Sequence, residues 1–504
     1  MMRSTKSAIN YSKLPKSLDY KESLSSFNDH ITDTRKVSIV PTNSTTYGSS
    51  QTSEAIIFVD DSSLGSMLHP DSCYLTCDIQ TLASGSASAT SLFNSSANDI
   101  IERIQIRSKR SRIQLADCRD FNVFSAMCDK LKYPQSYVGD APWTRGFPNE
   151  VHGATDGTAS ENNKTAGITA AGSVFNPNYG LASRNLVGMT ELGAGSRRYY
   201  IELKYCPFFQ NKKLIPLALS GGLEILITFA RLGDALVGCE VDNGTPASTT
   251  DEYTVKNLKF HCQVSYANDM LNAALQAEMK SGGLNIPYSS YASLQHNPKS
   301  TSESVRLSSA LEHLESIYIV HRFTSDLNNI TKASLAHFGN PKLEEAQFSS
   351  GGKTNPISPL ICTTTSGTKY SGEAYVELQH ACKTLDIDIK EDCQFNKTAM
   401  EIPLATSAPG VAYADDGSTG PLLTDVSKWN GACVYGLVMN SGKPFTSIYN
   451  RTSSMFSASQ KSDLIGTFKY TSDPSNFTMN AFLKFGNVMR IEANGVIVPE
   501  QLSF

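Results

Sequence analysis

Apolar and polar residues alternate one by one in many short stretches of this chain. The most apolar stretch is residues 198–233, in which Ile201, Leu203 and Tyr205 alternate with polar residues. A period of two places successive side chains on opposite faces of an extended backbone, so it is typical of a half-buried β-strand. The pattern therefore predicts a protein built mainly from strands.

A second alternating run follows Gly221-Gly222 within the same stretch. It gives residues 223–229 one apolar face, and a second face on which Glu224 and Thr228 are expected to stay partly exposed. Aromatic and β-branched residues, which favour strands, dominate both runs. The two runs are predicted to form a core hairpin or two neighbouring core strands, and they carry no chemistry themselves.

The same alternation recurs along the rest of the chain. Residues 100–115 alternate on both sides of a basic turn and predict a hairpin. Residues 481–498 predict another hairpin around Asn494-Gly495, a dipeptide favoured in tight turns. Further strands are expected at residues 35–40, 55–59, 74–82, 258–264, 317–323, 434–439 and 464–470.

Three stretches change to the helical period, in which apolar residues recur every three or four positions. Phe121, Phe124 and Leu131 are spaced in this way. Residues 268–280 and 372–383 show the same spacing. Short helices are therefore predicted between the strands.

Long stretches without periodicity separate these elements. Residues 133–196 and about 405–424 are rich in small and polar residues, and they are expected to form long exposed loops. Residues 1–50 hold seven basic and four acidic residues, a net charge of +3, and are interpreted as an N-terminal arm. The arm is expected either to be disordered in the free chain or to become ordered against a neighbouring subunit or a genome.

Many short strands with Gly, Ser and Pro in their turns favour a sandwich or jelly roll over a parallel α/β sheet. A polar break at residues 240–252 divides the strands into two halves that share an organisation. We therefore predict an all-β fold of two consecutive domains of the sandwich or jelly-roll type, with short inserted helices and long loops. The predicted limits are 1–50 for the arm, 51–250 for the first domain and 251–504 for the second.

Composition narrows the class of protein further. The chain has 504 residues and a net charge of −4, which gives no overall electrostatic case for binding nucleic acid. No apolar run approaches the ~18–20 residues that span a bilayer, and the N-terminus lacks the apolar region of a secretion signal. The eleven cysteines include no C-x-x-C pair, so we expect reduced thiols scattered in the core.

Candidate chemical sites are few, and each has a plainer interpretation. His380 and Cys382 are close in sequence but supply only two of the four ligands of a zinc site. The basic residues of the turn in 100–115 have no interleaved aromatic residues on which bases would stack, so a solvated turn or a subunit contact is favoured. These basic residues are Arg107, Lys109, Arg110 and Arg112.

An acidic cluster follows the third predicted helix. Its carboxylates are of the type that binds a hard cation or acts as an acid–base pair. Asp386 and Asp388 alternate with Leu385, Ile387 and Ile389, so the exposed face of a strand is the favoured interpretation. Glu391 and Asp392 complete the cluster. No nucleophile elbow, phosphate-binding loop, dinucleotide fingerprint or H-E-x-x-H motif is present, so no catalytic, cofactor or metal residue is predicted.

Several motifs resemble those of one family. A strand ending in aromatic residues, a short basic turn, Ile215-Pro216-Leu217, a glycine and an L-x-I-x-I-x-F strand resemble the end of the first jelly roll in double jelly-roll major capsid proteins. The similarity is to the polinton-like virus and virophage side of the family. Further resemblances are the helix start Arg119-Asp120-Phe121-Asn122-Val123, the run Glu373-Ala374-Tyr375-Val376-Glu377-Leu378, the stretch 343–360 and the closing strand 482–491.

Two of these motifs depart from the family pattern. Gln347-Phe348 inverts the expected order of aromatic residue and glutamine. Gly486-Asn487 stands where an acidic residue is usual. The resemblance covers about two-thirds of the chain without one long matching motif.

The resemblance implies that the two domains are two consecutive β-sandwich jelly rolls, a double jelly roll. It also implies a structural protein and no enzyme. Such a protein is expected to form homotrimers, which are pseudo-hexameric capsomers that tile an icosahedral virion shell around a DNA genome. It implies contacts with neighbouring capsomers and with minor capsid, penton or cement proteins, without a membrane-spanning segment. The implied location is the virion, after synthesis in a host cell and without secretion.

Two other classes of protein fit parts of the sequence. A carbohydrate-binding β-sandwich protein suits the composition, although only Trp143 and Trp429 are available as tryptophan platforms. A hydrolase on a β scaffold would need a convergent set of carboxylates or a nucleophile, which the motifs do not supply. Binding to glycans would favour the first class, and hydrolysis that depends on the acidic cluster would favour the second.

Overall fold

The computed structural model describes most of the predicted strands and all three predicted helices. The described residues are 31–48, 53–83, 89–132, 197–240, 250–308, 314–329, 334–335, 338–364, 369–389, 433–439 and 463–500. The first 30 residues and the two expected loops at 133–196 and 405–424 lie outside this set. Within it, no helix is long and apolar enough to cross a membrane.

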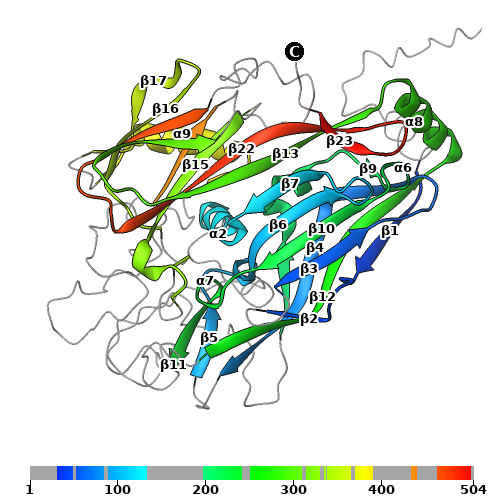
Figure 1. Ribbon diagram of the computed structural model, residues 1–504, viewed down its shortest axis with the longest axis horizontal. Helices are drawn as coiled ribbons and strands as arrows, with labels where there is room; N and C mark the ends of the chain where they lie inside the picture. The colour runs from blue at the N-terminus through cyan, green and yellow to red at the C-terminus, as the bar shows by residue number, and fades with distance from the viewer. Residues whose placement is uncertain are drawn as a thin grey trace, which may run out of the picture.

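Strands from the first half of the chain form two main antiparallel sheets (Figure 1). The first sheet holds, in spatial order, β1 (Ile31–Ile39), β12 (Thr250–Ala267), β4 (Ser66–Ala83) and β8 (Arg197–Glu202). The second holds β3 (Glu54–Val59), β10 (Leu223–Phe229), β6 (Ile101–Ser108) and β7 (Gln114–Arg119). The shorter strands are β2 (Thr46–Gly48) on β12, β9 (Ile215–Pro216) on β4, and the pair β5 (Ala89–Phe93) and β11 (Leu236–Glu240).

The second half repeats this arrangement. Its first sheet holds β13 (Leu284–His296), β22 (Phe477–Ile491), β15 (Leu314–Phe323) and β20 (Val434–Val438). Its second holds β14 (Ser302–Ser308), β21 (Leu464–Tyr470), β16 (Leu343–Ser350) and β17 (Lys353–Ile361). The shorter strands are β23 (Ile497–Glu500) on β22, and the pair β18 (Thr363–Thr364) and β19 (Lys369–Tyr370).

The strand order identifies the topology. When the eight main strands of each half are numbered along the chain, one sheet reads 1-8-3-6 and the other reads 2-7-4-5, in both halves. Two four-stranded sheets linked in this way form a jelly roll. The predicted fold class, an all-β double jelly roll, is confirmed.

Helices occupy equivalent places in the two rolls. Helix α2 (Phe121–Lys132) and helix α9 (Gly372–Lys383) each lie between the fifth and sixth main strands of their roll. Helix α8 (Asp269–Ser281) connects the two rolls, and the side chain of Asn268 accepts a hydrogen bond from the Leu271 amide to cap it. The remaining short helices are η3 (Ala97–Ile100), η5 (Leu203–Tyr205), η6 (Pro207–Gln210), α6 (Leu217–Ser220), α7 (Leu232–Ala235) and η7 (Thr324–Asp326).

The central apolar stretch differs from its prediction in two respects. Its two strands, β8 and β10, lie in different sheets and are not neighbours, because the segment between them crosses the sandwich through η5, η6, β9 and α6. The first strand is also shorter than expected, because Leu203–Tyr205 forms η5. A period of two identifies a strand, but it does not identify the strand's partner.

The predicted exposure of Glu224 is wrong. Its side chain is only 2% exposed, in a central strand that β3 and β6 flank. The guanidinium of Arg112 provides an ion-pair partner for the buried carboxylate. A charged residue in a central strand is thus tolerated because it is paired.

The sheet pairings also move the limits of the two rolls. Strand β1 lies in the expected arm, yet it pairs along its length with β12, from Asp33 opposite Tyr266 to Ile39 opposite Phe260. Strand β12 lies in the expected second roll, yet it also pairs with β4. A division at residue 250 would separate β12 from its sheet. We therefore propose Ile31–Ala267 as the first jelly roll and Leu284–Glu500 as the second, joined by α8.

Candidate functional site

The two jelly rolls meet along two strands that each end a sheet, β7 of the first roll and β13 of the second. The two strands run side by side (Figure 1). Instead of pairing through their backbones, they are linked by two tyrosine hydroxyls. Tyr288 donates to the carbonyl of Leu115 at 2.8 Å, and Tyr291 donates to the carbonyl of Arg119 at 3.0 Å. These bonds satisfy carbonyls at the open edge of a sheet, which would otherwise be free to pair elsewhere.

Burial keeps both phenols in the donating form. It raises the pKa of Tyr288 and of Tyr291 above the usual value for tyrosine, because a phenolate would lose its hydration in this environment. Both side chains are only 1% exposed. The two hydrogen bonds therefore persist across the physiological pH range.

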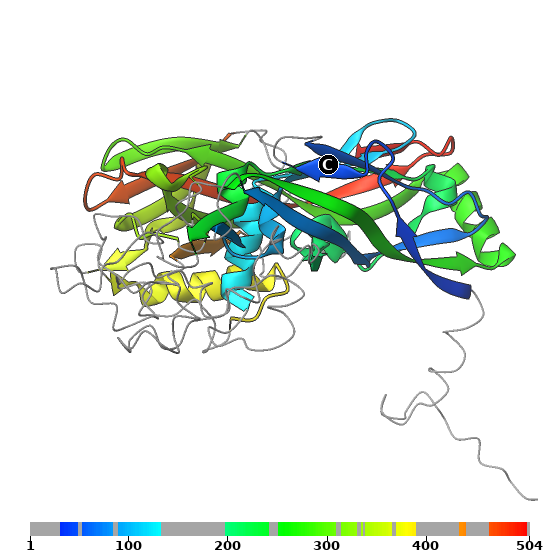
Figure 2. The same ribbon diagram turned by 90° about the horizontal axis from the view of Figure 1, so that it is seen from below.

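An aromatic cluster lies beside these bonds. The ring of Phe124, on α2, stacks on Tyr291 with the centroids 4.4 Å apart, and it lies 5.0 Å from Phe482 and 6.3 Å from Tyr318. Both views place α2 between the two rolls (Figure 1, Figure 2). The three partners of Phe124 come from the second roll, so the apolar core is continuous across both rolls.

Further contacts surround this cluster. At the turn between β22 and β23, Gly495 has a φ of +76° and lies so close to the first roll that a Cβ would meet the Leu219 carbonyl oxygen at 2.7 Å. Four hydrogen bonds also cross the junction: Ser111 Oγ to Ile497 O, Gln210 Nε2 to Leu385 O, Asn211 Nδ2 to Pro287 O, and Asn328 N to Asp234 Oδ1. The rolls are thus held in one orientation by packing and by directed polar contacts.

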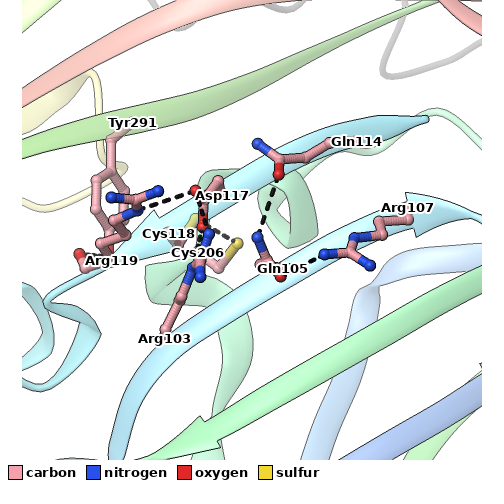
Figure 3. A network of polar contacts seen from close by, with 9 residues as sticks. All are labelled: Arg103, Gln105, Arg107, Gln114, Asp117, Cys118, Arg119, Cys206 and Tyr291. Carbon is pink, nitrogen blue, oxygen red and sulfur yellow. Dashed lines mark hydrogen bonds and ion pairs between the residues drawn. The ribbon is translucent and has the colours of Figure 1, made fainter. Parts of the chain in front are cut away.

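Charged residues support the β6–β7 hairpin next to the junction (Figure 3). Arg103 binds both oxygens of Asp117, at 2.6 and 2.7 Å, and Arg119 reaches the same carboxylate at 3.1 Å. Burial by itself would raise the pKa of Asp117, but the hydrogen bonds and charges of the two arginines lower it overall. The network continues along the same hairpin through Gln105, Arg107 and Gln114.

Asp117→Asn is expected to destabilise the protein by about 1–3 kcal/mol at pH 7, because it removes the charge-assisted, bidentate hydrogen bond from Arg103. The pKa of Asp117 is lower in the folded state, so its contribution is present above the unfolded pKa of about 4 and is lost as the pH falls further. The difference in melting temperature between wild type and variant should therefore shrink between pH 5 and about pH 2. Thermal melts across that range measure it, and a difference that does not change with pH would contradict the assignment.

Two cysteines lie beside this network. Cys118, on β7, and Cys206, between η5 and η6, are both fully buried, and their Sγ atoms are 3.0 Å apart (Figure 3). Burial raises the pKa of the Cys118 thiol well above its usual value. Nine cysteines in the described residues are buried free thiols, as the sequence predicted.

The basic turn lies against the second roll. Lys109 pairs with Asp60. The guanidinium of Arg110 approaches Gly495, where an added Cβ would lie 2.8 Å from Nη1. The turn therefore contacts the second roll through Arg110 and Ser111, whereas Lys109 and Arg112 form ion pairs within the first roll.

The other candidate residues do not form a site. His380 is exposed on α9, whereas Cys382 is buried, so the two side chains point in different directions. Asp386 and Asp388 are exposed, as expected, but they lie in a turn and an irregular segment after α9, where Asp386 has a φ of +59°. The strand expected there is absent from the described residues at 384–389, and the alternation reflects one side of an irregular segment packing on the core.

Some candidates lie outside the described residues. These are Glu391, Asp392, Trp143 and Trp429. Within the described ranges, no group of three or more His, Cys, Asp or Glu side chains is arranged to hold a metal ion.

Sequence analysis did not single out the residues that join the rolls. Phe124 was assigned to the apolar face of a helix, and Tyr288 and Tyr291 were not noticed. The signal was weak, since an apolar helix face looks the same whether it packs within its own roll or against another. Two tyrosines in the strand that follows α8 were the one available hint.

Comparisons with known proteins identify the fold. No family model matches the chain, and no curated protein matches it in sequence. Among solved structures, a chain of the Sputnik virophage matches with a TM-score of 0.54 and 10% identity, over 94% of this chain and 90% of the other. The Faustovirus major capsid protein matches with a TM-score of 0.53 and 9% identity, over 92% and 91% of the two chains.

A third match is VP54 of PBCV-1, fitted into a reconstruction of the virophage Sputnik. Its TM-score is 0.51 at 10% identity, over 94% of this chain and 97% of the other. The identities are too low to carry residue roles from one chain to another. Their near-complete coverage of both chains, together with the repeated strand order, shows that this chain has the double jelly-roll fold of the Faustovirus major capsid protein.

Proposed function

We propose that this chain is a major capsid protein, which builds the shell of a virus particle by assembling with copies of itself. The observation that carries this proposal is the pairing of two jelly rolls of identical strand order through one continuous core. Such a chain is a rigid unit with two similar lobes. The likeness in fold to a protein named as a major capsid protein supports the same role.

The two-lobed unit explains how a shell would be tiled. Three chains related by a threefold axis bring six similar lobes around that axis, which gives a nearly hexagonal block from a trimer. Closed cyclic symmetry of this kind is common in oligomers of a single chain. The finer elements of the proposal are the homotrimer, its use as a capsomer in an icosahedral shell, and a DNA genome inside.

Exposed apolar residues mark one surface suited to contacts between chains. Strand β17 ends its sheet, and on it Ile357 is 87% exposed and Ile361 is 44% exposed. An exposed edge strand with apolar side chains is a natural site for contact with another protein. In this proposal the chain acts through such surfaces as a structural protein, and no catalytic step is required.

The remaining elements follow from the capsid role. The partners are copies of this chain in the same and neighbouring capsomers, together with minor capsid, penton or cement proteins. The location is the virion, after synthesis in the host cell. Residues 1–50, the expected arm, include β1, which pairs with β12. In this proposal residues 1–30 contribute to the assembly of the shell.

The native mass of the purified chain tests the proposal. Three times the chain mass of 54.7 kDa gives about 164 kDa, so light scattering is expected to find a species near that mass, with larger shells beside it. Electron microscopy of that species should show a block with six lobes. A monomer at every concentration tested would contradict the proposal and would direct attention to glycan binding and hydrolysis.

A further inference from the structure

We propose that Cys118 and Cys206 are an oxidisable pair, which hydrogen peroxide converts into a disulfide that links strand β7 to the segment between η5 and η6 in the first jelly roll. The proposal concerns a covalent modification site and is independent of the capsid role. It adds to the expectation that the cysteines are reduced thiols scattered in the core.

The geometry places the two sulfur atoms almost at bonding distance. Their Sγ atoms are 3.0 Å apart, and a disulfide bond is about 2.05 Å long, so each sulfur would move by only about half an ångström. Cys118 lies on β7, which belongs to the sheet of β3, β10 and β6. Cys206 follows β8, which belongs to the opposite sheet. The bond would therefore join a strand of one sheet to the segment that follows a strand of the other sheet.

The chemistry requires one peroxide molecule for each pair. One thiol sulfur attacks a peroxide oxygen and breaks the O–O bond, giving a sulfenic acid and one water. The second thiol sulfur then displaces the hydroxyl from the sulfenic acid, forming the S–S bond and releasing a second water. The two sulfurs lose two electrons, which reduce hydrogen peroxide to two molecules of water.

Burial sets the rate and the selectivity of this reaction. Thiolates react much faster than thiols, and burial raises the pKa of the Cys118 thiol, so attack by this sulfur is slow. Hydrogen peroxide is small and uncharged, so brief local openings admit it more readily than they admit a bulky disulfide reagent. Once the first sulfur is oxidised, its partner is already in contact, so the second step is intramolecular and fast.

The disulfide between Cys118 and Cys206 should raise the stability of the folded protein. The two cysteines are separated by 88 positions in sequence, so the bond would close a long loop and restrict the unfolded chain. The melting temperature is expected to rise by about 5 °C when the bond forms. The bond would be absent in a glutathione-rich cytosol and would form in an oxidising environment.

A matched pair of cysteines provides the control. Cys73 and Cys262 are each 3% exposed and lie on the neighbouring strands β4 and β12. Burial raises the pKa of both, that of Cys262 to about 12. No sulfur–sulfur hydrogen bond joins Cys73 and Cys262 in the described residues, although Cys262 lies near enough to contribute to the raised pKa of Cys73. This pair therefore shares the burial of Cys118 and Cys206 without their hydrogen-bonded contact.

The experiment treats the full-length chain with hydrogen peroxide, blocks the remaining thiols in denaturant and maps peptides without reduction. The expected result is a cross-linked peptide joining Cys118 to Cys206, lighter by two hydrogen atoms than the separate peptides. Cys73 and Cys262 should be recovered as blocked thiols. Dithiothreitol should reverse both the cross-link and the rise in melting temperature, and Cys206→Ser should abolish the rise while Cys262→Ser retains it.

Peptide mapping of the wild-type chain tests for the Cys118–Cys206 disulfide even if a variant fails to fold. Recovery of Cys118 and Cys206 as blocked thiols after prolonged treatment would overturn the proposal. Conversion of either to sulfonic acid, or equal oxidation of Cys73 and Cys262, would overturn it as well.

Discussion

Replacing Phe124 with alanine is expected to lower the free energy of unfolding by about 3–5 kcal/mol, because it leaves a cavity in a fully buried aromatic cluster. The ring stacks on Tyr291 at 4.4 Å and lies 5.0 Å from Phe482, both in the second roll. The variant should therefore lose the coupling between the rolls as well as stability. Urea unfolding followed by tyrosine fluorescence and circular dichroism should show one transition in the wild type and two in the variant.

Phe348→Ala is a matched control. Phe348 is 2% exposed and packs edge-on against Phe468, with centroids 6.0 Å apart, inside the second roll alone. This variant should lose a similar amount of stability. Its two rolls should still unfold in one transition, as in the wild type. If Phe124→Ala unfolds in a single step that merely occurs earlier, the junction does not couple the two rolls as argued.

Lys484→Met is expected to destabilise the second roll by about 3–5 kcal/mol, because it leaves a buried carboxylate without its counter-charge. Lys484, on β22, and Glu315, on β15, are each 1% exposed, and Nζ lies 2.9 Å from Oε2. Lys484 also donates to the carbonyl of Thr384, just after α9. The pair thus ties the central strands of a sheet to the chain that follows a helix. Chemical unfolding at pH 7 measures the loss.

A double variant separates the cost of an unpaired charge from the value of the pair. Replacing both members of a buried ion pair with apolar residues of similar volume is often close to neutral, because no charge is then left buried. Lys484→Met combined with Glu315→Met should therefore recover most of the stability lost in the single variant. A double variant as unstable as Lys484→Met alone would show that packing or the Thr384 contact dominates at this site.

The junction gives a physical reason why this chain acts as one body. Interfaces between independent domains are usually polar and allow relative motion. Here an aromatic side chain of one roll lies inside the core of the other, and two edge strands are joined through buried hydroxyls. The proposed capsid role requires this rigidity, since a hinge between the two rolls would vary the surfaces that each copy presents to its neighbours.

Local elements were readable from the sequence. The hairpin of β6 and β7, the helices α2, α8 and α9, and the hairpin that ends in β23 all lie where periodicity and turn residues predicted them. The reason is that alternation, helical spacing and turn preferences depend on residues within a few positions of one another. The same patterns, with the family motifs, also predicted the double jelly roll.

Long-range pairing was decided only by the tertiary structure. Ile39 lies opposite Phe260 across more than 200 positions, and nothing local to either residue identifies its partner. For this reason β1 was assigned to the arm, and β12 was assigned to the second roll. Glu224 was expected at the surface because its neighbours in sequence do not reveal that strands flank it on both sides.

The sequence by itself thus determined the elements, the fold class and the absence of any recognisable catalytic motif. The tertiary structure decided the sheet partners and the residues at the junction of the rolls. Local patterns record how each residue meets its nearest neighbours along the chain. Phe124, Tyr288, Tyr291, Cys118 and Cys206 acquire their roles only when distant segments meet, so the energetics of the junction could be assigned only from the packed structure.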